Sequence, residues 1–163
     1  MAEIKLVRID FRLIHGQVVT QWVKVSGANR IVIANDALAA DDFMADIYRM
    51  AAPAGIGVDI MTIADVCEEW KENALGEGKV LVLFKSAGDA LAARKGGFEF
   101  DDAQVGGLGG DAGRVAAPCG IAFNKDDVET LRALEAEGVN VHVHVVPTQA
   151  DTPLAQAVDK LAL

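Results

Sequence analysis

The residues most suited to chemistry lie together near the start of the chain. Arg8, Asp10, Arg12 and His15 fall within eight positions of an otherwise apolar segment, and Gly16 follows at once. Two guanidinium groups can bind an anion, and a neutral imidazole is a nucleophile near physiological pH. Backbone N–H groups from Gly16 onward add further donors if a helix begins there. These residue types, at this spacing, indicate phosphoryl chemistry centred on His15.

Charged and apolar residues alternate strictly from Val7 to Leu13, as an extended strand requires. The alternation places Arg8, Asp10 and Arg12 on one side of that strand. Because unpaired buried ions are costly, we expect the three charges to lie where the strand leaves the sheet. An exposed strand end whose charges pair only among themselves, with the histidine in a plain loop, fits the same spacing. The pattern alone leaves both interpretations open.

Strand and helix patterns alternate along the whole chain. Strands are predicted at 4–9, 30–34, 58–63, 79–84, 103–106 and 139–146, and helices at 41–50, 65–75, 86–97, 125–137 and from 152 onward. This order predicts a doubly wound α/β fold, with an open, mostly parallel sheet and helices on both faces, in a single domain of residues 1–163. In such a sheet a ligand binds at the carboxyl ends of the strands, where His15 follows the first strand.

Polar residues also follow two other predicted strands. Asn35 and Asp36 come after the strand at 30–34, and Lys85 and Ser86 come after the strand at 79–84. Side chains at such positions reach a ligand in the crevice, so these four are candidates for lining the pocket. An ordinary turn explains the first pair equally well, and a helix cap beside a solvated lysine explains the second.

Composition excludes several classes of function. The chain has 163 residues with a formal net charge of −9, and it has no basic run that could follow a phosphate backbone, so we expect no nucleic-acid partner. It shows no signal-peptide pattern and no apolar stretch of about 18 residues, which favours a cytoplasmic protein.

Two further motifs carry no chemistry in our interpretation. The run at 107–112 formally fits a dinucleotide fingerprint, but no helix follows it, so we predict a flexible loop near the site. His142 and His144 share one face of a predicted half-exposed last strand, but no third ligand stands at a supporting spacing. We therefore predict no metal site.

The run from Arg8 to Val18, RIDFRLIHGQV, resembles the signature of the IIB component in the mannose/fructose/sorbose family of bacterial sugar phosphotransferase systems. Segments 31–36, 41–43, 50–53, 82–90 and 105–107 resemble later landmarks of that family. The resemblance implies a phosphotransferase in which His15 takes a phosphoryl group from a phosphohistidine of a IIA partner. His15 then passes it to a sugar that arrives through membrane IIC and IID partners.

The same resemblance implies the surroundings of such a protein. The phosphohistidine is transient, and no cofactor or metal is required. The protein would be cytoplasmic and associated peripherally with the membrane transporter, and a homodimer is plausible. The chain carries no recognisable IIA domain, so we expect the phosphoryl donor to be a separate polypeptide.

Phosphoryl transfer passes through a loose, in-line transition state, so positioning and cationic stabilisation do most of the catalytic work. We expect Arg12 to clamp the phosphoryl oxygens. Arg8 either joins it or pairs with Asp10, whose carboxylate orients the imidazole or holds Arg12 in place. Gly16 and Gln17 complete the predicted phosphate-binding segment.

Two other classes of protein stay open. A phosphohistidine mutase or phosphatase also uses a His-Gly element after a strand, but it expects arginine where Ile14 stands. A non-catalytic module could instead sense sugar transport through a partner. Phe11 stands where many family members carry a polar residue, and Leu108 stands where methionine is common. We therefore expect Phe11 to belong to a docking surface for partners.

Overall fold

The computed structural model describes residues 1–111 and 113–163, with the backbone but not the side chain of Gln17. Its strands are β1 (Glu3–Asp10), β2 (Arg30–Ala34), β3 (Gly57–Met61), β4 (Lys79–Phe84), β5 (Asp102–Gly107), β6 (Val115–Ala116), β7 (Ala122–Phe123), β8 (Asn140–Val143) and β9 (Thr152–Pro153). Its helices are α1 (Gly16–Ser26), α2 (Asp36–Ala39), α3 (Asp42–Ala51), α4 (Ile63–Asn73), α5 (Ala87–Lys95), α6 (Lys125–Ala136) and α7 (Leu154–Val158).

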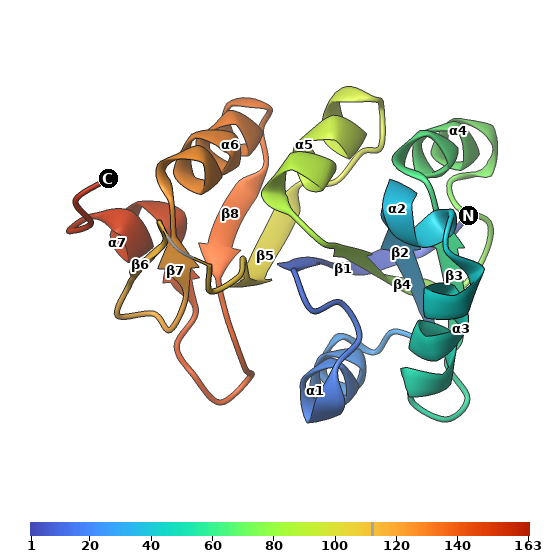
Figure 1. The fold of residues 1–163 in the computed structure, drawn as a ribbon. Helices are drawn as coiled ribbons and strands as arrows, with labels where there is room; N and C mark the ends of the chain where they lie inside the picture. Colours follow the sequence, from blue (N-terminus) through green and yellow to red (C-terminus); the bar gives the residue numbers. More distant parts are fainter. Residues whose placement is uncertain (112) are drawn as a thin grey trace.

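The main sheet has the order β3-β2-β4-β1-β5-β8-β9 across the described residues. The first six strands pair in parallel, and β9 pairs antiparallel to β8 at one edge. Helices α4, α5 and α6 cover one face, and α1 and α3 cover the other (Figure 1). This arrangement is the predicted doubly wound α/β fold.

The two faces of the sheet explain the apolar sequence of its strands. In β2, Val32 and Ala34 belong to the core cluster under α4, α5 and α6, whereas Ile31 and Ile33 belong to the cluster under α1 and α3. Successive residues of a strand point to opposite faces, so a strand covered on both sides must be apolar throughout. β1, which β4 separates from β2, departs from this rule, because it buries Arg8 and Asp10.

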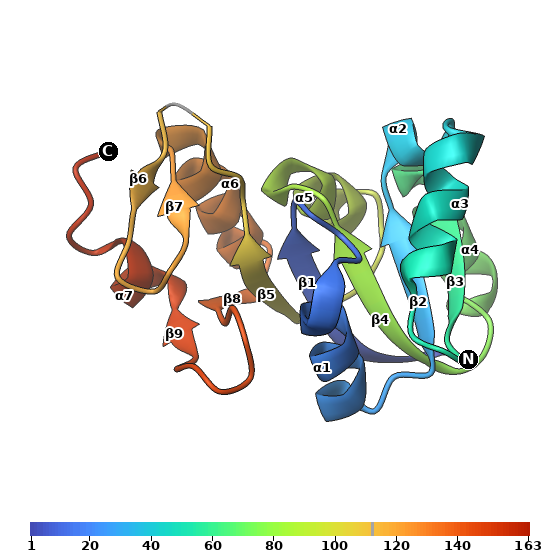
Figure 2. The same ribbon diagram turned by 60° about the horizontal axis from the view of Figure 1, so that its bottom comes forward.

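The candidate site lies at the carboxyl end of β1, the central strand of the sheet. The segment that joins β1 to α1 leaves the sheet at the end toward which the arrow of β1 points (Figure 2). In residues 1–111 and 113–163, no helix has both the length and the apolar character needed to cross a bilayer.

The structure corrects the sequence prediction at the last part of the sheet. The strand predicted at 139–146 ends at Val143, because the carbonyl groups of His144 and Val145 bond to the Arg8 side chain instead of to a neighbouring strand. Thr152 and Pro153 form β9 and do not begin a helix; α7 starts one residue later. β8 is therefore not the last strand, and His142 lies between two neighbours.

His142 holds this edge of the sheet together. Its Nε2 lies 2.7 Å from Oδ1 of Asp102 on β5, and its Nδ1 lies 2.6 Å from Oδ1 of Asp151 in the β8–β9 connection. Ionised carboxylates only accept hydrogen bonds, so both ring nitrogens must donate, and the ring is an imidazolium. The bond to Asp102 is the largest cause of a raised His142 pKa. Desolvation raises the pKa of Asp102, but hydrogen bonds from His142 and Asn140 outweigh it and the pKa is lowered.

These two shifts predict a pH-dependent contribution to stability. The contribution of His142 is complete below its unfolded pKa of about 6.5 and is lost as pH rises through the raised folded pKa; that of Asp102 is lost as pH falls below about 4. We expect His142→Gln to lower the free energy of unfolding by about 1 kcal/mol near pH 5.5, and by less at pH 9. Urea unfolding of both proteins across this pH range is the measurement. A difference in the free energy of unfolding that does not change with pH would contradict the prediction.

Candidate active site

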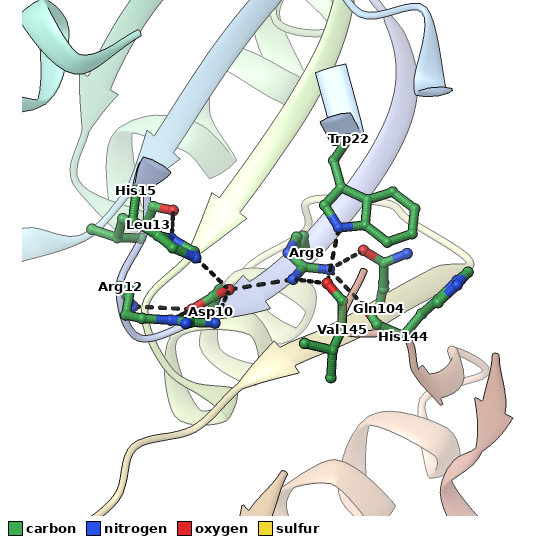
Figure 3. Close-up of polar contacts among 9 residues, drawn as sticks. All are labelled: Arg8, Asp10, Arg12, Leu13, His15, Trp22, Gln104, His144 and Val145. Carbon is green, nitrogen blue, oxygen red and sulfur yellow. Dashed lines mark hydrogen bonds and ion pairs between the residues drawn. The ribbon is translucent and has the colours of Figure 1, made fainter. Parts of the chain in front are cut away.

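His15 is the N-cap residue of α1 and follows a tight turn after β1. In this turn the Leu13 N–H donates to the Asp10 carbonyl oxygen at 3.0 Å, and Leu13 has a left-handed backbone with φ 55°. That conformation directs the Leu13 carbonyl oxygen to His15 Nδ1, at 3.0 Å (Figure 3). A carbonyl oxygen can only accept, so Nδ1 carries a proton in this arrangement.

The second ring nitrogen of His15 faces Asp10. Nε2 is buried without a hydrogen-bond partner in the described part of the chain, and it lies 3.9 Å from Asp10 Oδ2. In the neutral ring Nε2 bears the lone pair, so the nucleophilic nitrogen points inward to a carboxylate and not outward to solvent. A phosphoryl donor can therefore reach a ring nitrogen only after the imidazole rotates.

Asp10 is the centre of the charged cluster. Its carboxylate is fully buried, and it accepts from the Arg12 backbone N–H at 3.1 Å and from Arg12 Nε at 3.2 Å. Arg12 Nη2 and Arg8 Nη2 both donate to Asp10 Oδ2 at 3.3 Å. Asp10 thus holds Arg12 in place and lies against the His15 ring, which are the two orienting roles predicted from the sequence.

Arg8 departs from the expectation that the charges would lie where the strand leaves the sheet. It is 2% exposed, within β1, and donates to the carbonyl oxygens of His144 at 2.8 Å and Val145 at 2.9 Å and to the Gln104 side chain. Desolvation lowers the pKa of Arg8 to about 10, so it stays a cation at neutral pH. Burial is tolerated because oxygen atoms surround the guanidinium group. Arg8 pairs with Asp10 and orients it, which is one of the two roles expected of it from the sequence.

Arg12 is the accessible cation of the cluster. Its side chain is 40% exposed, and its guanidinium carbon lies 5.4 Å from the centre of the Phe11 ring. Phe11 is 38% exposed. One edge of the guanidinium group is fixed by Asp10, which leaves the other edge free to meet an anion beside His15. This is the geometry that the predicted clamp requires.

The start of α1 supplies backbone donors next to His15. No side chain caps this helix, no acidic residue lies in its first turn, and Gly16 takes a left-handed φ of 47°. The first N–H groups of a helix have no partner within it, so they can bind phosphoryl oxygens. The side chain of Gln17 lies outside the described part of the structure, so its predicted role stays a prediction.

Three of the four predicted pocket residues line one cavity. Asn35, Lys85 and Ser86 line a cavity of about 450 Å³, together with Phe11 and the glycine-rich segment around Gly109. His15 and Arg12 are not among the lining residues, so the cavity lies outside the predicted phosphate-binding cluster.

The prediction that Asp36 lines the pocket is wrong. Its Oδ1 accepts from the backbone N–H of Ile63 at 2.8 Å, so it ties α2 to the start of α4 and does not line the cavity. Sequence reasoning missed Asp89, which lines the cavity and accepts from Asn35 Nδ2 at 3.0 Å. Desolvation raises the pKa of Asp89. Its position three residues after Ser86 was the available signal, but that spacing is also that of an ordinary capped helix.

The burial of Arg8 depends on Gly106. A Cβ atom on Gly106 would lie 2.0 Å from Arg8 Nη2 and 2.2 Å from Arg8 Cζ. Gly106 lies in β5, next to β1, so only a residue without a side chain lets the guanidinium group cross between these strands. A Cβ on neighbouring Gly107 would lie 3.3 Å from Asp10 Oδ1 and from Phe11 Cδ1, a tight contact but no overlap.

Comparisons with known proteins point to one family. Residues 4–162 match the family model described as the PTS system sorbose subfamily IIB component. The chain is 30% identical over 158 residues to the sorbose-specific EIIB component of Lacticaseibacillus casei, covering 97% of this chain and 96% of that one.

Two further relatives extend these comparisons. The chain is 28% identical over 158 residues to the mannose-specific EIIAB component of Escherichia coli K12, covering 97% of this chain but only 49% of that protein. The crystal structure of manxB from Thermoanaerobacter tengcongensis superposes with a TM-score of 0.92 at 34% identity, and covers 100% of this chain and 99% of that one.

Replacement of Gly106 tests the buried charge cluster. We expect Gly106→Ala to lower the free energy of unfolding by about 3 kcal/mol, because the added methyl group must displace a buried cation from its partners. Gly88→Ala is the matched control, since its Cβ would lie 3.7 Å from Ser86 Oγ and would meet no clash. Urea unfolding of both variants is the measurement; equal stability of the two would show that Arg8 has room to move.

Proposed function

The chain belongs to the sorbose subfamily of IIB components of the sugar phosphotransferase system, and from this premise we propose that His15 is the residue that carries the phosphoryl group. A IIB component is a phosphocarrier and a phosphotransferase. The observation that supports His15 is its contact with Asp10, which at the same time holds the exposed Arg12 beside the ring.

Transfer of the phosphoryl group from the donor to His15 is a single displacement at phosphorus. A phosphohistidine on a IIA protein presents its phosphoryl group in line with a ring nitrogen of His15; the bond to the donor nitrogen breaks as the bond to His15 forms. A neutral attacking nitrogen has no proton to lose, so no general base is required. The resulting phosphoramidate is labile and can pass its phosphoryl group to a sugar hydroxyl.

The residues around His15 stabilise the charge on the equatorial oxygens during this exchange. Arg12 donates from its free edge, and the first N–H groups of α1 donate from the start of that helix. Asp10 fixes the direction of Arg12. The imidazole must first turn away from the Leu13 carbonyl and from Asp10, and we propose that docking of the donor drives this rotation.

The partners follow from the same proposal. A IIA protein is the phosphoryl donor, which is supported by the EIIAB relative whose length this chain half covers. We propose that membrane IIC and IID components deliver the sugar and select it; the relatives named for sorbose and mannose support a sugar as the final acceptor. The protein would then work on the cytoplasmic side, attached peripherally to these membrane components.

Phosphorylation of His15 is directly testable. The protein is incubated with phosphoenolpyruvate, the general phosphotransferase proteins and a IIA protein of this family. We expect one acid-labile phosphate per chain, lost in His15→Ala and retained in His142→Gln, which removes a histidine at the far edge of the sheet. Equal labelling of His15→Ala would show that the phosphoryl group is carried elsewhere.

The role of Arg12 is a separate prediction. We expect Arg12→Gln to reduce the single-turnover rate of phosphoryl transfer about 10²-fold, because an exposed charge that acts only on the transition state is removed. Arg12→Lys should recover part of the rate, since it restores the charge but not the planar fork. Rapid-quench kinetics against phosphorylated IIA provides the rates, and a wild-type rate in Arg12→Gln would rule out the clamp.

A further inference from the structure

Trp22 connects the helix that begins at His15 to a distant part of the chain. It lies near the middle of α1, seven residues after His15. It is 4% exposed, and its indole Nε1 donates to the Val145 carbonyl oxygen at 3.1 Å.

The acceptor of this bond also holds the charged cluster. The Val145 carbonyl oxygen accepts from Arg8 Nη2 at 2.9 Å, and the Arg8 guanidinium carbon lies 5.1 Å from the centre of the Trp22 ring. The ring also meets His144 edge-on, with centres 4.8 Å apart. One indole therefore contacts both the cation that orients Asp10 and the loop that holds that cation, on the far side of Arg8 from His15 (Figure 3).

Local sequence does not fix the start of α1. No side chain caps it, and Leu13 and Gly16 both take left-handed conformations on either side of His15. Such an entry into a helix lacks the bonds that usually set its direction. The distance between His15 and Asp10 is then set by the turn at Leu13 together with contacts further along the helix, and Trp22 is a residue of α1 that bonds to the Arg8 cluster.

We propose that Trp22 is a positioning residue for phosphoryl transfer, which locks α1 to the Arg8–Asp10 pair and so fixes the backbone position from which the His15 imidazole turns toward the donor. The inference rests on the proposed role of His15 as phosphocarrier. Trp22 is buried and contacts neither the phosphoryl group nor the donor protein. It acts on the rate of the chemical step through the geometry of His15.

Two variants separate the parts of this contact. Trp22→Phe keeps an aromatic face under Arg8 but removes the N–H; Arg8 still satisfies the Val145 carbonyl oxygen, so this variant leaves no unpaired acceptor. Trp22→Leu removes the ring as well. We expect kcat for phosphorylation by IIA to fall about five-fold in Trp22→Phe and about 10²-fold in Trp22→Leu, with KM for phosphorylated IIA unchanged.

Trp70 provides the matched control. It is a partly buried tryptophan on α4 that packs edge-on against Phe98, with ring centres 5.2 Å apart, on the opposite face of the sheet. Trp70→Phe and Trp70→Leu lose comparable packing and should keep the wild-type kcat. All proteins are compared at a temperature at which circular dichroism shows them fully folded. If a Leu variant does not fold, the comparison of kcat rests on Trp22→Phe and Trp70→Phe.

A second measurement does not depend on a partner protein. Two-bond proton–nitrogen spectra of the His15 ring should show a single Nδ1–H form in the wild type, and a mixture of ring forms in Trp22→Phe and Trp22→Leu. A purely structural role would lower stability and leave both this spectrum and kcat as they are.

The outcomes separate the two claims. Wild-type kcat and ring spectrum in the Trp22 variants, or a loss of kcat no greater than in the matching Trp70 variants, would overturn the positioning role and leave the phosphocarrier proposal intact. Failure of wild-type His15 to be labelled would instead overturn the phosphocarrier proposal, and the positioning role for transfer with it.

Discussion

The buried ion pair of Arg8 and Asp10 constrains the rest of this structure. A charge inside a sheet is tolerated only when every polar atom around it is matched, and removal of one partner leaves the other unpaired. Here the match requires a glycine on the neighbouring strand at Gly106, the Gln104 side chain, and two carbonyl groups from the connection after β8. The early end of β8 is a direct consequence, since those carbonyl groups bond to Arg8 instead of to another strand.

The same pair determines the shape of the turn that presents His15. Asp10 accepts from the Arg12 backbone and side chain, which bends the chain back over the strand end. The left-handed conformation of Leu13 then places its carbonyl oxygen against the imidazole. A strained residue at this point is consistent with a functional turn, because the surrounding bonds must hold it there. Reactive and structural groups are thus parts of one hydrogen-bonded unit.

The sequence predicted what depends on local pattern. Alternating strands and helices indicated the doubly wound fold, because periodicity reports directly which faces are buried. Residue types near His15 indicated its chemistry and the orienting role of Asp10. The burial of Arg8 was not predictable, since its partners include main-chain carbonyl groups more than a hundred residues away. Every residue has a carbonyl group, so residue types do not indicate which ones accept from Arg8. The predictions that Asp36 lines the pocket and that Thr152 begins a helix were wrong for a related reason. Each is a common turn residue, and its role depends on which strand or helix packs beside it.

The balance of charge suits a carrier that must both accept and release a phosphoryl group. Two arginines and one aspartate leave a net single positive charge beside His15, in a chain whose formal net charge is −9. A site with both guanidinium groups free would bind the phosphorylated state tightly, and tight binding of a ground state slows the next transfer. Asp10 instead engages Arg8 inside the sheet and one edge of Arg12. In the proposed mechanism a single guanidinium edge of Arg12 is then left for the phosphoryl oxygens, enough to stabilise the transition state without trapping the intermediate on either side of it.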